Sequence, residues 1–217
     1  MTDFLNRRTT MVDTQIRPAD VTKFPIIDAM LQVRREVFVP DHLRETAYAD
    51  AILDLGHGRI ILEPRTFAKM LDAVDIQSNE LVLDLGCGLG YSSAVIGRFS
   101  EAVVAIEQNK DMAAEAEANL AADGCLNVAV VQGNLAEGAV QHAPFDVIVV
   151  QGAVEHVPGS VIAQLAEGGR IVAVFSQKGQ GAVRVGYKSD GQMSWRFACN
   201  AFAPVLSGFV KERSFAL

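Results

Sequence analysis

The sequence predicts an α/β fold in which helices cover a doubly wound, mostly parallel sheet. From Leu81 onward, short apolar segments alternate with segments of helical character. These apolar segments lack the polar alternation of a half-exposed strand, which is typical of parallel strands buried on both faces. A glycine-rich turn, "DLGCGLG", follows the first of them, and open parallel sheets bind ligands at such turns.

Residues 1–78 are expected to form a helical N-terminal cap. "FLNRRTTMVDTQI" and "FPIIDAMLQV" are predicted helices, and the second places Ile26, Met30 and Val33 at helical spacing. A third helix, "PRTFAKMLDAV", begins with Pro64, a residue that suits the first turn of a helix. The segment "GRIILEP" precedes this helix. From its sequence, it is either a buried strand or the apolar wall of a site.

Residues 79–176 are expected to form the sheet and its helices. The predicted strands are "LVLDLG", "AVVAIE", "NVAVVQG", "FDVIVVQG" and "RIVAVF", and the predicted helices are "YSSAVIGRF", "NKDMAAEAEANLAADG" and "GSVIAQLAEGG". In residues 177–217, "AVRVGYK" and "QMSWRFACNAF" flank Asp190-Gly191, a hairpin turn signal, so an antiparallel pair is expected at the sheet edge. The three regions are interpreted as one domain, residues 1–217.

Composition excludes several classes of protein. The 217 residues are 50% hydrophobic and carry a net charge of -7, whereas nucleic-acid-binding surfaces are normally basic. The three cysteines lack paired spacing, which argues against a disulfide framework or a zinc site and favours a reducing compartment. No apolar run suggests a signal peptide or a membrane span, so a cytoplasmic protein is expected.

The glycine turn is the strongest candidate for a ligand site. Gly86, Gly88 and Gly90 follow the first strand, and glycines permit close approach of a ligand to the backbone. A dinucleotide fingerprint read from Gly86 would need glycine where Tyr91 stands, so a nicotinamide dehydrogenase is disfavoured. The alternative is a tight turn without a ligand.

Acidic and amide side chains near this turn indicate which ligand it binds. Asp84 would place a carboxylate beside the turn, where it suits an ammonium and sulfonium ligand. Glu107 ends the next strand and can accept hydrogen bonds from two ribose hydroxyls. Asn134 follows the third strand and could pair with an adenine edge, or simply form a turn. Together these features predict S-adenosylmethionine.

Several motifs in order resemble the protein-L-isoaspartate O-methyltransferase family. They are "MVDTQI", "DAMLQVRREVFVP", "AYAD", "VLDLGCGLGYSSAVIG", "APFDVIVV" and "QLAEGGRIV", and they extend from Met11 to Phe175. The resemblance implies a seven-stranded Rossmann-like domain that methylates the carboxylates of damaged aspartyl residues, a protein-repair activity. The expected cofactor-binding set is Asp84, Gly86, Cys87, Gly88, Gly90, Glu107, Gln108, Asn134 and Leu135, with Asn134 standing where the family usually has aspartate.

The segment "GRIILEP" departs from the family pattern. Family members carry hydroxyl side chains where Ile60 and Leu62 stand, and aliphatic groups cannot donate hydrogen bonds to an acceptor carboxylate. Arg59 and Arg65 flank the segment; each could bind an anionic acceptor, or could pair with Glu63 or another neighbour. His57 is either a candidate base or an ordinary turn residue.

Three functions therefore remain open from the sequence. The first is methylation of an isoaspartyl protein or peptide. The second keeps S-adenosylmethionine but transfers the methyl group to a more apolar small molecule. The third is a cofactor-binding protein without catalysis. No metal site is expected, because the adjacent pair Glu155-His156 does not have metal-ligand spacing.

Overall fold

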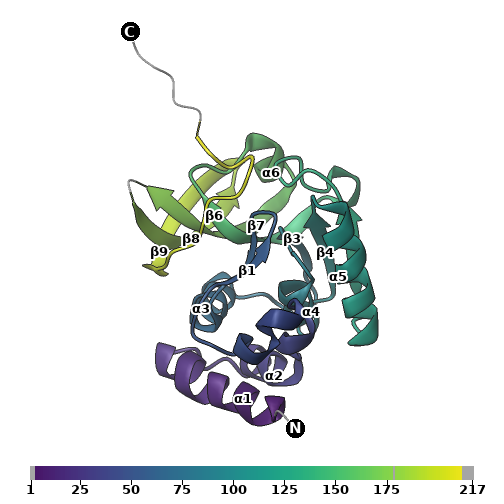
Figure 1. Cartoon of the computed structure of the whole chain (residues 1–217). Coiled ribbons are helices and arrows are strands. Elements are labelled where there is room, and N and C mark those ends of the chain that lie inside the picture. The colour runs from purple at the N-terminus through teal and green to yellow at the C-terminus, as the bar shows by residue number, and fades with distance from the viewer. Residues whose placement is uncertain (1–2, 178, 212–217) are drawn as a thin grey trace.

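A seven-stranded sheet runs through the computed structural model, which describes residues 3–177 and 179–211 (Figure 1). The strand order is β5-β4-β3-β6-β7-β8-β9; the first five strands in this order are parallel, and β8 and β9 are antiparallel. The strands are β3 (Leu81–Leu85), β4 (Ala102–Glu107), β5 (Val128–Gln132), β6 (Phe145–Val154), β7 (Leu165–Gln177), β8 (Gln180–Ser189) and β9 (Gln192–Asn200).

Successive residues of the central strands enter two separate hydrophobic clusters. Val82 belongs to the cluster on one face of the sheet and Leu83 to the cluster on the other; Val147 and Ile148 divide in the same way. All four side chains are fully buried. The uninterrupted apolar runs in the sequence therefore reflect a sheet that is covered on both faces.

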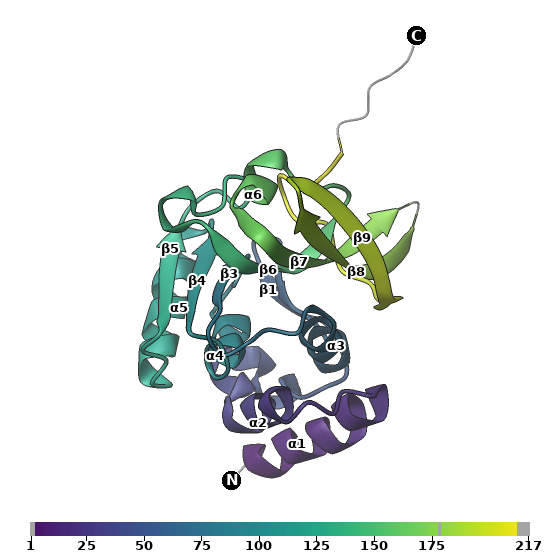
Figure 2. The ribbon, with the colours of Figure 1, turned by 180° about the vertical axis from the view of Figure 1, so that it is seen from behind.

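Helices cover these two faces unequally. Five helices contribute residues to the cluster on one face: α1 (Phe4–Met11), α2 (Phe24–Gln32), α3 (Pro64–Val74), α4 (Tyr91–Gly97) and α5 (Lys110–Ala122). The other face is covered by α6 (Gly159–Ala163) and by irregular segments; Figure 2 shows α6 on the side of the strands opposite α3 and α4. A π-helical turn spans Val12–Ile16, and 3₁₀ turns span Arg17–Ala19, Arg35–Val37, Asp41–Thr46 and Val140–His142.

A separate two-stranded hairpin precedes α3. It consists of β1 (Leu53–Gly56) and β2 (Arg59–Ile61), which pair antiparallel. His57 and Gly58 form its turn with φ angles of 54° and 70°, the left-handed conformation that a two-residue hairpin turn requires. Figure 1 shows the hairpin between the sheet and helices α3 and α4.

Most predicted elements are confirmed. The Asp190-Gly191 turn has φ angles of 53° and 71° and joins β8 to β9 at the sheet edge. The predicted helix "GSVIAQLAEGG" is wrong in extent: α6 ends at Ala163 and β7 begins at Leu165. Gly168 has a φ of 78°, which a continuing helix could not accommodate. Residues 178 and 212–217 of the predicted C-terminal region lie outside the described residues.

The chain after β9 returns to the carboxyl end of β6. The N–H of Ala153 donates to the carbonyl of Pro204 at 2.9 Å, and the N–H of Leu206 donates to the carbonyl of Ala153 at 2.9 Å. A Cβ at Gly152 would lie 2.7 Å from the Leu206 side chain, so this close packing requires glycine. Within residues 3–177 and 179–211, no helix combines the length and the hydrophobicity needed to cross a bilayer.

Candidate cofactor and acceptor site

The glycine turn adopts a backbone that other residues would strain. Gly86, Gly88 and Gly90 have φ angles of 82°, 57° and 99°. The turn is tied to the neighbouring strand, because the N–H of Gly86 donates to the carbonyl of Ile106 at 2.9 Å. A Cβ at Gly88 would lie 2.8 Å from Leu55 Cδ1, so the β1–β2 hairpin lies directly against this turn.

Glu107 is the buried carboxylate of the site. It ends β4 and is 0% exposed. Its Oε2 accepts from the N–H of Gly88 at 3.0 Å, and its Oε1 accepts from the N–H of Asn109 at 2.9 Å. Nε of Arg59 lies 3.0 Å from both carboxylate oxygens. A buried acid that is bonded to the glycine turn fits the recognition of a ribose diol, as its place in the sequence predicts.

Asp84 lies beneath the turn and is fully buried. It accepts hydrogen bonds from Ser92 Oγ and Ser93 Oγ at 2.6 Å each and from Gln151 Nε2 at 2.7 Å. Burial raises the pKa of Asp84, and these three donors oppose that rise. The carboxylate thereby connects β3 to α4 and β6. Its predicted pairing with an ammonium group stays a prediction.

The remaining predicted cofactor residues differ in burial. Leu135 is fully buried, with Cδ1 3.5 Å from the position of a Cβ at Gly86. Cys87 is buried as well, and burial together with the nearby carboxylates of Asp84 and Glu107 raises the pKa of its thiol well above the usual value. Two other predicted residues, Gln108 and Asn134, are exposed.

Asn134 forms a turn in this structure. Its Oδ1 accepts from the N–H of Ala136 at 3.0 Å, and its Nδ2 donates to Glu137 Oε1 at 3.3 Å. The turn interpretation of this residue is therefore supported by its contacts, while its role in adenine recognition stays a prediction. Leu206 is an apolar neighbour of the site that sequence reasoning missed; its Cδ1 lies 3.7 Å from the Cβ position at Gly86.

The segment "GRIILEP" is buried throughout its apolar part. Ile60 and Ile61 are 7% exposed and Leu62 is 1% exposed, and all three belong to the larger hydrophobic cluster. Arg35 holds this segment in place, because its Nη2 donates to the carbonyl of Leu62 at 2.8 Å. The guanidinium of Arg35 also lies 4.6 Å from the ring centroid of Tyr91, the first residue of α4. The "GRIILEP" segment and the helix that follows the glycine turn are thus connected through one buried arginine.

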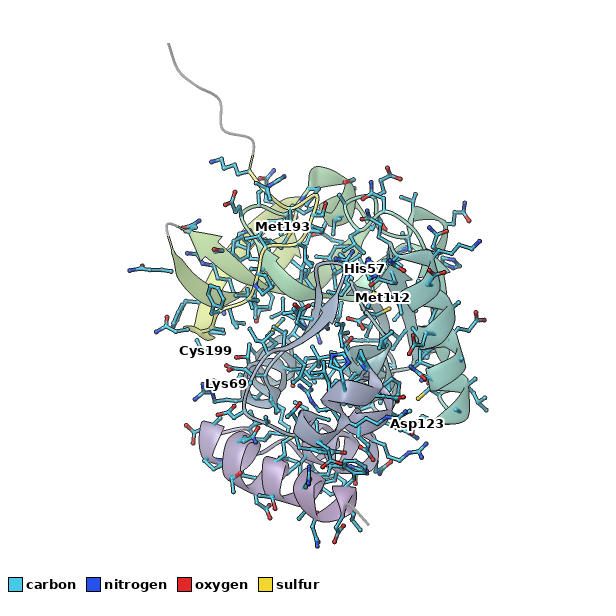
Figure 3. The ribbon with its side chains drawn as sticks, in the orientation of Figure 1. His57, Lys69, Met112, Asp123, Met193 and Cys199 are labelled. Atoms are coloured by element: carbon cyan, nitrogen blue, oxygen red, sulfur yellow. The ribbon has the colours of Figure 1, made fainter. Side chains whose placement is uncertain are left out.

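The charged residues that flank the segment have different surroundings. Arg65 is exposed and lies 3.5 Å from Glu63, which agrees with the ion pair considered from the sequence. Arg59 is only 4% exposed and reaches Glu107, a partner 48 residues away that the sequence did not predict. His57 is exposed at the tip of the hairpin (Figure 3), so the structure supports its interpretation as a turn residue.

Comparisons with known proteins agree with this geometry. The family model described as "Protein-L-isoaspartate(D-aspartate) O-methyltransferase (PCMT)" matches residues 6–208. The chain is 41% identical over 171 residues to protein-L-isoaspartate O-methyltransferase 1 of Rhodopseudomonas palustris, covering 79% of this chain and 70% of that one. It is 37% identical over 207 residues to the Roseiflexus castenholzii protein-L-isoaspartate O-methyltransferase, covering 95% and 94% of the two chains.

The chain belongs to the protein-L-isoaspartate(D-aspartate) O-methyltransferase family. A solved structure of a protein-L-isoaspartate O-methyltransferase superposes with a TM-score of 0.81 at 26% identity, covering 94% of this chain and 67% of the other. A second, from Plasmodium falciparum in complex with S-adenosyl-L-homocysteine, has a TM-score of 0.79 at 18% identity, with coverage of 96% and 100%, and shows the shared fold.

Membership of this methyltransferase family confirms the predicted enzyme class and cofactor. The protein is an S-adenosylmethionine-dependent methyltransferase with the Rossmann-like, seven-stranded sheet predicted for it. The residues of the turn fit that cofactor, because backbone that only glycine tolerates adjoins a buried carboxylate and two buried leucines. Gln151 was missed by sequence reasoning, although its position in "FDVIVVQG", after a continuous apolar run, is a signal that could have found it.

Proposed function

We propose that this protein methylates the carboxylate of isoaspartyl residues in proteins or peptides. The observation that carries the proposal is the placement of Glu107, buried and bonded to Gly88, directly beside the hairpin that holds the acceptor segment. The family match over residues 6–208 includes both regions. The free cysteines Cys87, Cys125 and Cys199 fit action in the reducing cytoplasm.

We assign roles to the residues around the glycine turn. Glu107 would accept hydrogen bonds from the ribose hydroxyls, and Leu135 and Leu206 would provide apolar contact for the adenine ring. Gly86 and Gly88 allow the cofactor to approach the backbone. When bound, S-adenosylmethionine supplies a sulfonium methyl group: the acceptor oxygen bonds to the methyl carbon as the C–S bond breaks, and the electron pair stays on sulfur.

The protein needs no general base for this reaction. An isoaspartyl carboxylate is ionised at neutral pH and carries its own nucleophilic oxygen. The work of the protein is to align that oxygen and to keep water away. The buried side chains of Ile60, Ile61 and Leu62 exclude water from the segment, and the exposed His57 needs no part in proton transfer.

The test is methyl transfer to two matched peptides. One contains a single isoaspartyl residue, and the other has the same sequence with a normal aspartyl residue. We expect transfer from labelled S-adenosylmethionine to the isoaspartyl peptide and at least ~100-fold less to its aspartyl partner, since discrimination rests on the placement of one carboxylate. Binding of S-adenosylhomocysteine without transfer to either peptide would contradict the proposal and would leave a different acceptor, or cofactor binding without catalysis, as the alternatives.

A further inference from the structure

Arg59 connects the acceptor segment, "GRIILEP", to the proposed cofactor site at the glycine turn and Glu107. It is the first residue of β2, directly before Ile60, and its guanidinium is directed toward β4 rather than solvent. Its Nε lies 3.0 Å from both oxygens of Glu107, and the two side chains are 5% and 0% exposed. The pair is therefore shielded from the screening that weakens surface ion pairs.

Arg59 competes with the cofactor for Glu107, because the carboxylate of Glu107 can accept only a limited number of hydrogen bonds. A carboxylate offers about four lone-pair positions. The N–H groups of Gly88 and Asn109 occupy one on each oxygen. Arg59 takes the positions that remain, and these are the positions that two ribose hydroxyls would need. Arg59 and the ribose cannot both be bound fully to the same carboxylate.

An arginine displaced from Glu107 needs another anion. A buried guanidinium without a partner is strongly unfavourable, because its lost hydration is not replaced. The neighbouring carboxylates are already engaged: Asp84 accepts from two serines and a glutamine, and Glu63 accepts from Thr66 and pairs with Arg65. The cofactor also carries a carboxylate, but it belongs to the amino-acid part, whose ammonium group is predicted to lie at Asp84. The ligand that brings an anion beside the acceptor segment is the acceptor itself.

We infer that Arg59 determines specificity for an anionic acceptor by exchanging partners, binding Glu107 before the cofactor arrives and the acceptor carboxylate afterwards. This rests on the proposed function. The exchange supplies a hydrogen-bond donor to a segment in which Ile60 and Leu62 provide none. The exchange also couples the two ligands. The cofactor, by binding Glu107, frees Arg59 for the acceptor, and the acceptor, by binding Arg59, frees Glu107 for the cofactor. Each ligand therefore strengthens binding of the other by the same factor.

The experiment measures cofactor-product affinity without turnover. S-adenosylhomocysteine is titrated calorimetrically into the wild type, into R59Q and into R65Q, a matched control in which the exposed arginine of the same segment is neutralised. Each titration is repeated with saturating isoaspartyl peptide and with the same peptide whose isoaspartyl carboxylate is amidated. Circular dichroism and thermal unfolding confirm that each variant is folded.

Three results are expected. Without peptide, R59Q binds S-adenosylhomocysteine about tenfold more tightly than the wild type, since the competitor for Glu107 is gone. The isoaspartyl peptide tightens binding to the wild type and R65Q by about fivefold or more, a usual size for coupling between two sites. The amidated peptide has no such effect, and neither peptide tightens binding to R59Q.

Other results overturn the inference. Equal or weaker binding by R59Q without peptide would show that Arg59 does not compete with the cofactor. Equal coupling in R59Q and wild type would show that another group holds the acceptor. If R59Q does not fold, R59K serves instead: a lysine keeps the charge without the guanidinium geometry, so its affinity should exceed the wild type by a smaller factor, and unchanged affinity contradicts the proposal.

These titrations and the peptide methylation assay described above together separate this inference from the proposed function. If none of the three proteins binds S-adenosylhomocysteine, the cofactor assignment fails and the inference fails with it. If all bind it equally and the isoaspartyl peptide is still methylated, the proposed function stands and only the role of Arg59 is lost.

Discussion

Each end of the parallel sheet carries an arginine–carboxylate pair, and the surroundings of the two pairs differ. At the amino end, Arg170 of β7 donates to both oxygens of Glu80, at 2.6 Å from Nη1 and 2.8 Å from Nη2. At the carboxyl end, Arg59 donates from Nε to both oxygens of Glu107. Both acids also accept from backbone N–H groups. The arginines differ: Arg170 bonds to two carbonyls at the end of α3, whereas Arg59 bonds to the carbonyl of its own neighbour Gly58.

Backbone contacts account for this difference. Arg170 donates further hydrogen bonds to the carbonyls of Val74 and Asp75 at the end of α3, so its guanidinium is anchored between a helix terminus and the sheet. At the other end, two backbone N–H groups hold the carboxylate of Glu107, and its arginine belongs to a short hairpin. The amino-end pair therefore stabilises the fold, whereas the carboxyl-end pair is the one that exchanges partners in the inference above.

The variant E107A tests the carboxyl end and should have the largest effect. It removes the acceptor for the ribose hydroxyls and for the N–H of Gly88, and it leaves Arg59 buried without an anion. We expect S-adenosylhomocysteine to bind at least ~100-fold more weakly, because unmade hydrogen bonds to a buried charged group are costly. Calorimetric titration measures the affinity. Affinity within threefold of the wild type would remove Glu107 from the cofactor site.

The variant R170A tests the amino end. It leaves Glu80 with the N–H of Gln77 but without its ion-pair partner, and it removes the donor to the carbonyls at the end of α3. We therefore expect the free energy of unfolding to fall by about 2–4 kcal/mol. Urea denaturation measures this loss. Titration of the folded variant should give a cofactor-product affinity within about twofold of the wild type. A loss of affinity comparable with that of E107A would contradict the separation of roles.

The variant E80Q tests the charge of the amino-end pair through pH and should have the smallest effect. Burial alone would raise the pKa of Glu80, but the hydrogen bonds from Arg170 and from the N–H of Gln77 outweigh it and hold the pKa below its ordinary value. A lowered folded-state pKa gives stabilisation that is present above the unfolded-state pKa and is lost as pH falls through the folded-state value. The stability of the wild type should therefore exceed that of E80Q at neutral pH.

Urea denaturation of both proteins across a pH series measures this difference. The gap in the free energy of unfolding should be constant near neutrality and should narrow below about pH 5, as the carboxylate of the wild type becomes protonated. R170A provides the control, because its Glu80 lacks the ion-pair partner and should show a weaker pH dependence. If the difference in the free energy of unfolding between wild type and E80Q stays unchanged down to pH 3, Glu80 stabilises the fold through its shape rather than its charge.

Much of the fold could be predicted because its signals are local. Strands buried on both faces appear as apolar runs, and Pro64 and Gly124 mark the beginning of one helix and the end of another. The glycine turn and Glu107 were predicted because the order of strand, turn, helix and strand brings the carboxyl ends of neighbouring parallel strands together.

The remaining features depend on contacts between distant parts of the chain. Arg59 was predicted either to bind an anionic acceptor or to pair with a neighbour, and its pairing with Glu107 depends on how the hairpin packs against the glycine turn. The position of Gln151 after an apolar run marks it as a candidate, but its bond to Asp84 spans 67 residues and depends on the pairing of β6 with β3. The extent of α6 was missed because the helical propensity of "IAQLAEGG" is overridden by pairing of Leu165 with Phe145 in the sheet.

The packing of residues 203–209 has a consequence for the order of events during synthesis. Leu206 approaches both Gly86 and Gly152, so it forms part of the corner that begins with β3. These residues are translated after all seven strands of the sheet. The corner around Gly86 therefore stays incomplete until this segment, made last, has folded back onto the carboxyl end of β6.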